Sequence, residues 1–225
     1  MSVDHPVTLN LAERPATEVA AHLLATRPSL HRAGEKAINL RIQADALQWI
    51  AANVTSGMRT LETGCGYTSV TLVACGAHHT AVSPVAGEHQ AVLDKCNELG
   101  LLTDQLSFVC EGSETALPSQ DPTPLDFVLV DGSHAFPWPF LDWFYTAPRL
   151  VVGGHVMVDD THLRTGATLR SFLVGESAHW ELVAELKRTA VFRKLDEDVV
   201  NPSWTGQPWG ARVIKRRWLR RLWWR

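Results

Sequence analysis

Five titratable side chains, in the runs DGSH at 131–134 and DDTH at 159–162, carry the chemistry that this sequence is equipped to do. Carboxylates held at close range cannot all stay ionised unless a cation joins them or their pKa values rise. Because an all-oxygen ligand set suits a hard cation such as Mg²⁺, Asp131, Asp159 and Asp160 are candidate metal ligands. His134 is the candidate general base, since a neutral imidazole titrates in the useful range, and His162 is its reserve.

Each of these assignments has a plainer alternative. Asp131 could contact a cofactor or the backbone, while Asp159 and Asp160 could cap the following helix. His134 could serve only to hydrogen-bond its own loop, and His155 is expected to be structural because it lies inside a strand. The metal site requires the carboxylates of Asp131, Asp159 and Asp160 to lie close together in the fold, whereas the plainer alternatives do not.

Each acidic run follows a predicted strand. Residues 125–130, LDFVLV, form the most continuous apolar run and indicate a central parallel strand buried on both faces. Residues 151–158 predict a further strand. In an open α/β sheet, ligands bind beyond the carboxyl ends of the strands. Both runs are therefore expected to share one crevice with Glu62, Ser83 and Gly112.

A glycine loop lies at the centre of residues 58–76, MRTLETGCGYTSVTLVACG. Residues 59–62 predict a short buried strand, GCG at 64–66 a tight turn, and Thr68 or Ser69 the N-cap of a helix. Such a loop brings backbone N–H groups and a helix N-terminus close to a nucleotide-like ligand, because glycine has no Cβ. A turn that uses glycine for sharpness alone is the structural alternative.

The rest of the chain predicts one α/β domain of alternating strands and helices. Further strands are expected at 79–82 and 106–110, and helices at 17–25, 44–53, 88–99 and 139–147. This alternation favours a doubly wound sheet. Two β-like runs at 180–186 and 190–195 are separated by only three residues, which predicts a hairpin that inserts one antiparallel strand. No strand is expected before residue 57, so residues 1–56 predict a helical cover.

Charge and cysteine content restrict the class of protein. The net charge is −3 over 225 residues, but seven of the 21 basic residues lie in 212–225. The rest of the chain holds 14 basic and 24 acidic residues, a net charge of −10, which disfavours nucleic acid as a partner. Cys65, Cys75, Cys96 and Cys110 have no metal-site spacing. Without a signal peptide or an apolar run that could span a membrane, they are expected to be reduced core residues of a cytoplasmic protein.

The basic end of the chain predicts a separate segment. Residues 201–210 hold two prolines and two glycines and are typical of a linker. Residues 212–225 place tryptophan and leucine opposite arginine on a short helix, a composition that favours peripheral contact with anionic membranes. A disordered tail, or one packed on the body of the protein, is the alternative, and affinity for nucleic acid is another.

The runs ETGCGYTS, LDFVLVDGSH and GGHVMVDDTH occur in this order and are followed by the predicted hairpin. Together they resemble the class I S-adenosylmethionine-dependent methyltransferases, in particular the small-molecule and sugar O-methyltransferases with DG-x-H and DD motifs. The resemblance covers about residues 45–197. It implies a Rossmann-like α/β fold with a seven-stranded sheet and an antiparallel last strand. The implied domains are a cover at 1–56, a cofactor-binding domain at 57–198 and a tail at 199–225.

The resemblance also implies which residues hold the cofactor, S-adenosylmethionine. The methionine and ribose parts would contact Glu62, Gly64, Cys65, Gly66, Tyr67, Thr68 and Ser69. Where many relatives carry a ribose-binding acid, this chain has Ser83, so Ser83 or the later Glu88 would serve. Ser113 would contact adenine, and Asp131 is a further candidate cofactor contact. Related catechol-type enzymes hold Mg²⁺ on acids comparable to Asp131, Asp159 and Asp160.

The activity implied is methylation of a hydroxyl on a small molecule or sugar, with His134 as the base. Phe136 and Trp138 could form an aromatic wall for the acceptor. A cofactor-binding fold without catalysis, associated with a membrane or with nucleic acid, is the alternative. A nicotinamide dehydrogenase is disfavoured because the acidic strand ends have no role in hydride transfer.

Overall fold

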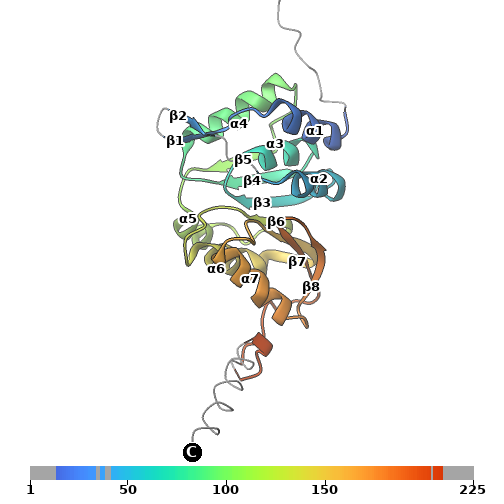
Figure 1. The fold of residues 1–225 in the computed structure, drawn as a ribbon, viewed down its shortest axis with the longest axis vertical. Coiled ribbons are helices and arrows are strands. Elements are labelled where there is room, and N and C mark those ends of the chain that lie inside the picture. The colour runs from blue at the N-terminus through green and yellow to red at the C-terminus, as the bar shows by residue number, and fades with distance from the viewer. Residues whose placement is uncertain (1–13, 34–35, 39–41, 204, 210–225) are drawn as a thin grey trace, which may run out of the picture.

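The computed structural model describes residues 14–33, 36–38, 42–203 and 205–209. A seven-stranded sheet forms its centre, and helices cover both faces (Figure 1). The strand order is β5-β4-β3-β6-β7-β9-β8. The first five strands in this order run parallel, and β9 is antiparallel to both β7 and β8. This confirms the predicted doubly wound sheet of seven strands with an antiparallel last strand.

The bounds of the elements are as follows. The strands of the large sheet are β3 (Arg59–Thr63), β4 (His78–Val82), β5 (Leu106–Val109), β6 (Leu125–Val130), β7 (Leu150–Val158), β8 (Trp180–Glu185) and β9 (Ala190–Lys194). The helices are α1 (Ala16–Thr26), α2 (Ala44–Asn53), α3 (Tyr67–Ala74), α4 (Ala86–Glu98), α5 (Ser113–Ser119), α6 (Trp138–Thr146), the 3-10 turn η1 (Ala147–Arg149) and α7 (Arg164–Gly175). A separate two-stranded hairpin consists of β1 (His31–Ala33) and β2 (Lys36–Ile38).

The central strand β6 divides the core into two layers because its side chains alternate between the two faces of the sheet. Phe127 and Leu129 pack with α1, α2, α3 and α4, whereas Val128 and Val130 pack with α5, α6 and α7. All four side chains are almost fully buried. Burial on both faces explains why this strand is a continuous apolar run, and it fixes the acidic residues that follow the strand at the sheet's edge.

Several sequence predictions are corrected by the structure. The N-terminal segment contains the hairpin β1–β2 as well as helices, because strands of three residues are too short to leave a period. Helix α3 begins at Tyr67, with Gly66 as its N-cap, so Thr68 and Ser69 lie in its first turn. Of the four free cysteines, Cys110 is exposed.

Part of the prediction for the C-terminal tail falls on residues that the structure does not describe. Residues 210–225, with the predicted amphipathic segment, lie outside the described residues. Among the described helices, none is both long and apolar enough to cross a membrane.

Candidate active site

A cavity of about 850 Å³ lies beyond the carboxyl ends of the parallel strands β3, β4, β6 and β7. This volume is in the range of small-molecule and cofactor sites. Most of the predicted site residues line it: Gly64, Cys65, Gly66, Tyr67, Thr68, Ser83, Ser113, Asp131, His134, Asp159, Asp160 and His162. The topology thus brings the glycine loop and both acidic runs to one place, as the rule for open α/β sheets requires.

The glycine loop passes very close to the end of β6. Gly64 has φ +101°, and a Cβ at this position would lie 2.6 Å from the carbonyl oxygen of Asp131. A side chain is therefore excluded both by backbone conformation and by contact. At Gly66 an added Cβ would lie 2.9 Å from Nε2 of His31. The loop is a smooth backbone surface on the cavity wall, with the N-terminus of α3 directly behind it.

Glu62 lies beneath this loop and is not among the residues that line the cavity, so its role as a cofactor contact stays a prediction. The carboxylate is almost fully buried and accepts hydrogen bonds from the hydroxyls of Thr68 and Ser69. Its Oε1 atom is also 3.2 Å from Nε2 of His79. Ser69 is fully buried as well, and its Oγ accepts the N–H of Gly66 at 3.0 Å. Glu62 and Ser69 hold the loop in shape from below.

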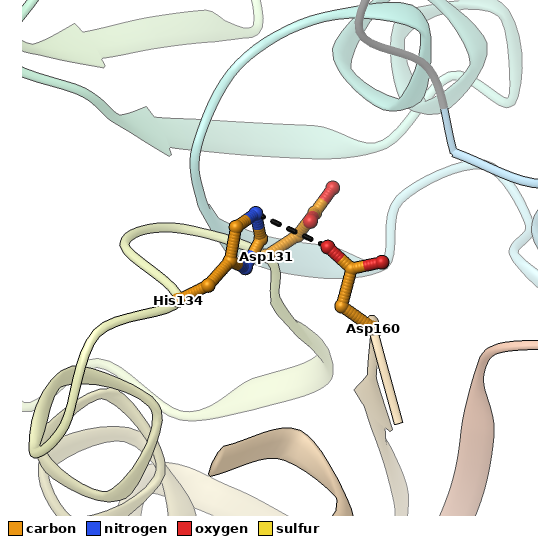
Figure 2. A group of neighbouring side chains, drawn as sticks. All are labelled: Asp131, His134 and Asp160. Carbon is orange, nitrogen blue, oxygen red and sulfur yellow. Dashed lines mark ion pairs between the residues drawn. The ribbon is translucent and has the colours of Figure 1, made fainter. Parts of the chain in front are cut away.

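Asp131, His134 and Asp160 form a compact group in the same cavity (Figure 2). Asp131 follows β6, His134 lies on the loop that leaves β6, and Asp160 follows β7. One ligand atom from each residue lies within 4.8 Å of the others. Nε2 of His134 is 3.1 Å from Oδ2 of Asp160, and Nδ1 of His162 is 3.3 Å from Oδ1 of Asp160. The carboxylate of Asp160 therefore contacts both candidate bases, His134 and His162.

Asp159 takes a different direction from its neighbour and is not part of the group Asp131, His134 and Asp160, so the set of three aspartate ligands stays a prediction. The hydroxyl of Thr189 donates a hydrogen bond to Oδ1 of Asp159, and both side chains are buried. Asp159 still lines the cavity and remains near Asp131. The alternative of helix capping is corrected, because the N-cap of α7 is Leu163 and no side chain caps that helix.

Burial and the proximity of other carboxylates raise the pKa values of Asp131 and Asp159. Burial raises the pKa of Asp131 well above its usual value, and the charges of Asp159, Glu62 and Asp160 raise it further. Burial likewise raises the pKa of Asp159. The site therefore favours anything that adds positive charge between these carboxylates.

Two glutamates and a tryptophan also line the cavity. Glu114 of α5 folds back toward Gly112, and the indole N–H of Trp138 donates to its Oε2 at 3.0 Å. Trp138 lines the cavity, whereas Phe136 is 74% exposed and does not. Of the predicted aromatic wall, only Trp138 is in place. The second glutamate, Glu88 of α4, also lines the cavity.

Sequence reasoning missed His31, Ile42 and Arg188, all of which line the cavity. Arg188 lies in the turn between β8 and β9, and His31 is the first residue of β1. None of the three belongs to a recognisable motif. Only the fold brings them to the site, so the sequence carries no signal that would have found them.

Asp142 of α6 is a fully buried carboxyl group behind the cavity wall. A Cβ at Gly132 would lie 3.2 Å from its Oδ2. Neither oxygen has a hydrogen-bond partner among the described residues, although Ser113 and Thr63 lie near enough to limit the shift of its pKa. Burial raises the pKa of Asp142 from 3.8 to about 6, because the charged form loses its hydration.

The substitution Asp142→Asn is expected to stabilise the protein by about 1–3 kcal/mol at pH 8, with little change near pH 4. The folded-state pKa of about 6 lies above the ordinary value of 3.8, so the folded state holds the proton more tightly. The cost of ionising Asp142 is therefore absent below pH 3.8 and grows as the pH rises through 6. Urea unfolding of both proteins at the two pH values measures the difference. An equal effect of the substitution at both values would contradict it.

Comparisons with known proteins agree with this architecture. Residues 61–161, less than half of the chain, match the family described as "Methyltransferase domain". No curated protein sequence gives a significant match. Three similar solved structures show the range of proteins that share the fold. Cofactor-bound Rv0187 from MTB has a TM-score of 0.59 and 13% identity, over 79% of this chain and 89% of that one.

The second is a protein from Staphylococcus aureus described as a caffeoyl-CoA O-methyltransferase, with a TM-score of 0.57 and 15% identity over 81% of this chain and 93% of that one. The third is an rRNA methylase from Streptococcus thermophilus, with a TM-score of 0.52 and 14% identity over 71% of this chain and all of the other. At these identities the structural similarity establishes the fold alone. The family match adds support for methyl transfer from S-adenosylmethionine.

Proposed function

We propose that this chain is an S-adenosylmethionine-dependent methyltransferase that methylates a hydroxyl group of a small-molecule acceptor. One observation carries the proposal, which is that the glycine loop and the group Asp131, His134 and Asp160 open into the same cavity. The loop suits a nucleotide-like cofactor, and the group suits deprotonation of a hydroxyl. The family match over residues 61–161 supports the same reading.

The chain's own residues fit the cofactor. The smooth backbone at Gly64 and Gly66 leaves room for a ligand against the loop. Five acidic residues and one arginine are among the described residues that line the cavity: Glu88, Glu114, Asp131, Asp159, Asp160 and Arg188. This excess of negative charge favours a ligand that carries a sulfonium and an ammonium group. When bound, S-adenosylmethionine supplies a methyl group that an acceptor oxygen can displace in line from sulfur.

His134 is the residue placed to take the proton of the acceptor hydroxyl. Its side chain is 46% exposed, so it reaches the open part of the cavity. The carboxylate of Asp160 accepts from or pairs with Nε2 of His134 and orients the ring. The second imidazole on the same carboxylate, His162, is placed to act if His134 is otherwise engaged.

The same group could hold a divalent cation, which we propose as Mg²⁺. Asp131 and Asp160 supply carboxylate oxygens, and His134 is the third possible ligand in place of the predicted Asp159. Burial and the neighbouring carboxylates raise the pKa of Asp131, which supports the binding of a cation between these groups. A set that includes imidazole is also suited to Mn²⁺. A bound cation would act as a Lewis acid on the acceptor oxygen. With His134 as a ligand, His162 becomes the base.

A small molecule fits the site better than nucleic acid. The acids that line the cavity would repel a polyanion, and Arg188 alone does not offset them. His31 of the hairpin β1–β2 and Trp138 of α6 also line the cavity. The rRNA methylase among the structural neighbours shares the fold at 14% identity, which does not carry its substrate over.

Turnover with methyl-labelled S-adenosylmethionine tests the function. A panel of phenols, sugars and other hydroxylated molecules is expected to include an acceptor whose oxygen takes the label, whereas an rRNA transcript is expected to take none. Removing divalent cations with EDTA is expected to abolish transfer, and Mg²⁺ or Mn²⁺ to restore it. Labelling of RNA alone would overturn the small-molecule proposal. Full activity after EDTA treatment would contradict the proposed role of the cation. His134 would then act as the base without a metal ion.

A further inference from the structure

The turn between β8 and β9 lies at the cavity edge of the sheet, beside the loop that follows β7. β9 runs antiparallel to β7, and Ala190 at the start of β9 pairs with Val158 at the end of β7. The end of the turn is therefore brought to the carboxyl ends of the parallel strands. This turn lies outside the residues that match the family.

Hydrogen bonds hold the turn in place. A backbone hydrogen bond of 2.8 Å joins its two ends. The backbone N–H of Lys187 donates to Oδ2 of Asp45, in the first turn of α2, at 2.9 Å. The backbone N–H of Thr161, in the loop after β7, donates to the carbonyl oxygen of Arg188 at 2.7 Å. The backbone from which the Arg188 side chain extends is therefore fixed against two other parts of the fold.

The side chain of Arg188 is exposed and lines the cavity. Among the described residues that line the cavity, it is the one lysine or arginine. Arg170 and Arg193 both pair with glutamates of β8, whereas the guanidinium of Arg188 has neither a hydrogen bond nor an ion pair with any described residue. Its N–H donors are therefore available to a ligand in the cavity.

The order of the strands places Arg188 on the far side of the acidic group from the glycine loop. In the sheet, β3, β6, β7 and β9 are successive neighbours. The glycine loop follows β3, Asp131 follows β6, Asp160 follows β7, and Arg188 precedes β9. Neighbouring strands lie about 5 Å apart. A molecule with its hydroxyl beside Asp160 can therefore reach Arg188 with a second group that lies about one ring away.

The charge of the cavity favours one kind of group at Arg188. The planar fork of a guanidinium matches the oxygens of a carboxylate or a phosphate. Five acidic residues line the same cavity, so each further negative charge on a ligand is repelled. A carboxylate carries one negative charge, which one arginine can offset, whereas a phosphate ester carries close to two.

We propose that Arg188 binds a carboxylate of the acceptor, so that the acceptor is a small hydroxy acid whose hydroxyl lies at the group Asp131, His134 and Asp160. The inference rests on the proposed function, because it takes methyl transfer to a hydroxyl as the reaction. Arg188 is a specificity-determining residue. It holds the far end of the acceptor and takes no part in the removal of the proton.

The test measures methyl transfer from labelled S-adenosylmethionine to matched pairs of aromatic and aliphatic hydroxy acids and their amides, such as hydroxybenzoates and hydroxybenzamides. The full-length protein is expected to favour the carboxylates in kcat/KM by about tenfold or more, since hydrogen bonds between charged groups are lost in the amides. Arg188→Gln is expected to remove this preference, mainly by raising KM, because Arg188 does not contact the reacting oxygen. Arg188→Lys keeps the charge without the planar fork and is expected to retain part of the preference.

Lys187→Gln is the matched control, because Lys187 is a neighbouring cation of the same turn and is not among the residues that line the cavity. It is expected to keep the wild-type preference. Both Gln variants retain the backbone hydrogen bonds of the turn, so both are expected to unfold at the wild-type temperature.

Four results would count against the inference. If the wild type methylates the amides as well as the carboxylates, the inference is overturned while the proposed function stands. A preference that survives in Arg188→Gln, or that falls equally in Lys187→Gln, would overturn the assignment to Arg188. Faster transfer to the corresponding phosphate esters than to the carboxylates would overturn the choice of a carboxylate. If no hydroxyl of any probe takes the label, the proposed function fails and the inference falls with it.

Discussion

Replacing His134 with alanine is expected to lower kcat by about 10²- to 10⁴-fold, the usual contribution of a general base. The affinity for S-adenosylhomocysteine is expected to change little, because His134 belongs to the loop after β6 and not to the glycine loop. Its imidazole is held 3.1 Å from Asp160 and has no other described hydrogen-bond partner through its ring. Steady-state kinetics with saturating cofactor, beside calorimetry on the same sample, separate the two effects.

His162→Ala is the matched control for this experiment, because His162 contacts the same carboxylate at 3.3 Å. A base at His134 predicts a much smaller loss of kcat in the control. The concentration of Mg²⁺ that gives half-maximal rate distinguishes a base from a ligand. If His134→Ala raises this concentration strongly and His162→Ala carries the larger loss of kcat, then His134 is a ligand and His162 the base. Activity within severalfold of wild type in His134→Ala would contradict any chemical role for His134.

The sheet was predictable because its signals are local. The apolar run LDFVLV is buried on both faces as expected, and the short turn between β8 and β9 required an antiparallel strand. The place of the site followed from topology alone, because parallel strands deliver their carboxyl ends to one edge. These inferences needed only hydrophobic pattern and chain connectivity, which are both present in the sequence.

The direction of individual side chains was less predictable. Asp159 and Asp160 are consecutive residues just beyond β7, and their side chains take different directions where Asp160 adopts a positive φ of 50°. Only Asp160 therefore joins Asp131 and His134, while Asp159 meets Thr189. Both side chains line the cavity, but the sequence does not say which of them also contacts His134.

Partners that are distant in sequence were beyond prediction. His31 and Glu88 are 57 positions apart, and β1 has only three residues. Glu62 turns away from the cavity because the hydroxyls of Thr68 and Ser69 and the ring of His79 satisfy it from the other side. Such contacts depend on how separate elements pack, and no local pattern records them.

Replacing Gly64 with alanine is expected to reduce cofactor affinity at least tenfold and to destabilise the fold by about 2–4 kcal/mol, the sum of an unfavourable φ and an overpacked contact. An added Cβ would lie 2.6 Å from the carbonyl oxygen of Asp131, which is backbone and cannot rotate away. Relief requires the glycine loop to separate from the end of β6. The two walls of the proposed cofactor site would then move apart.

Gly57→Ala is the control that isolates backbone strain, because Gly57 has φ +83° and nothing within 4 Å of the added Cβ. It is expected to cost only about 1 kcal/mol and to leave cofactor affinity unchanged. Gly66→Ala supplies the complementary case, since the added Cβ would meet only the movable ring of His31 at 2.9 Å and its φ of 171° is extended. It should fold like the wild type and still bind cofactor more weakly. Thermal unfolding ranks the three variants by stability, and calorimetry ranks them by cofactor affinity. Equal stability and equal affinity in Gly64→Ala and Gly57→Ala would show that the close approach of loop and strand does not shape the site.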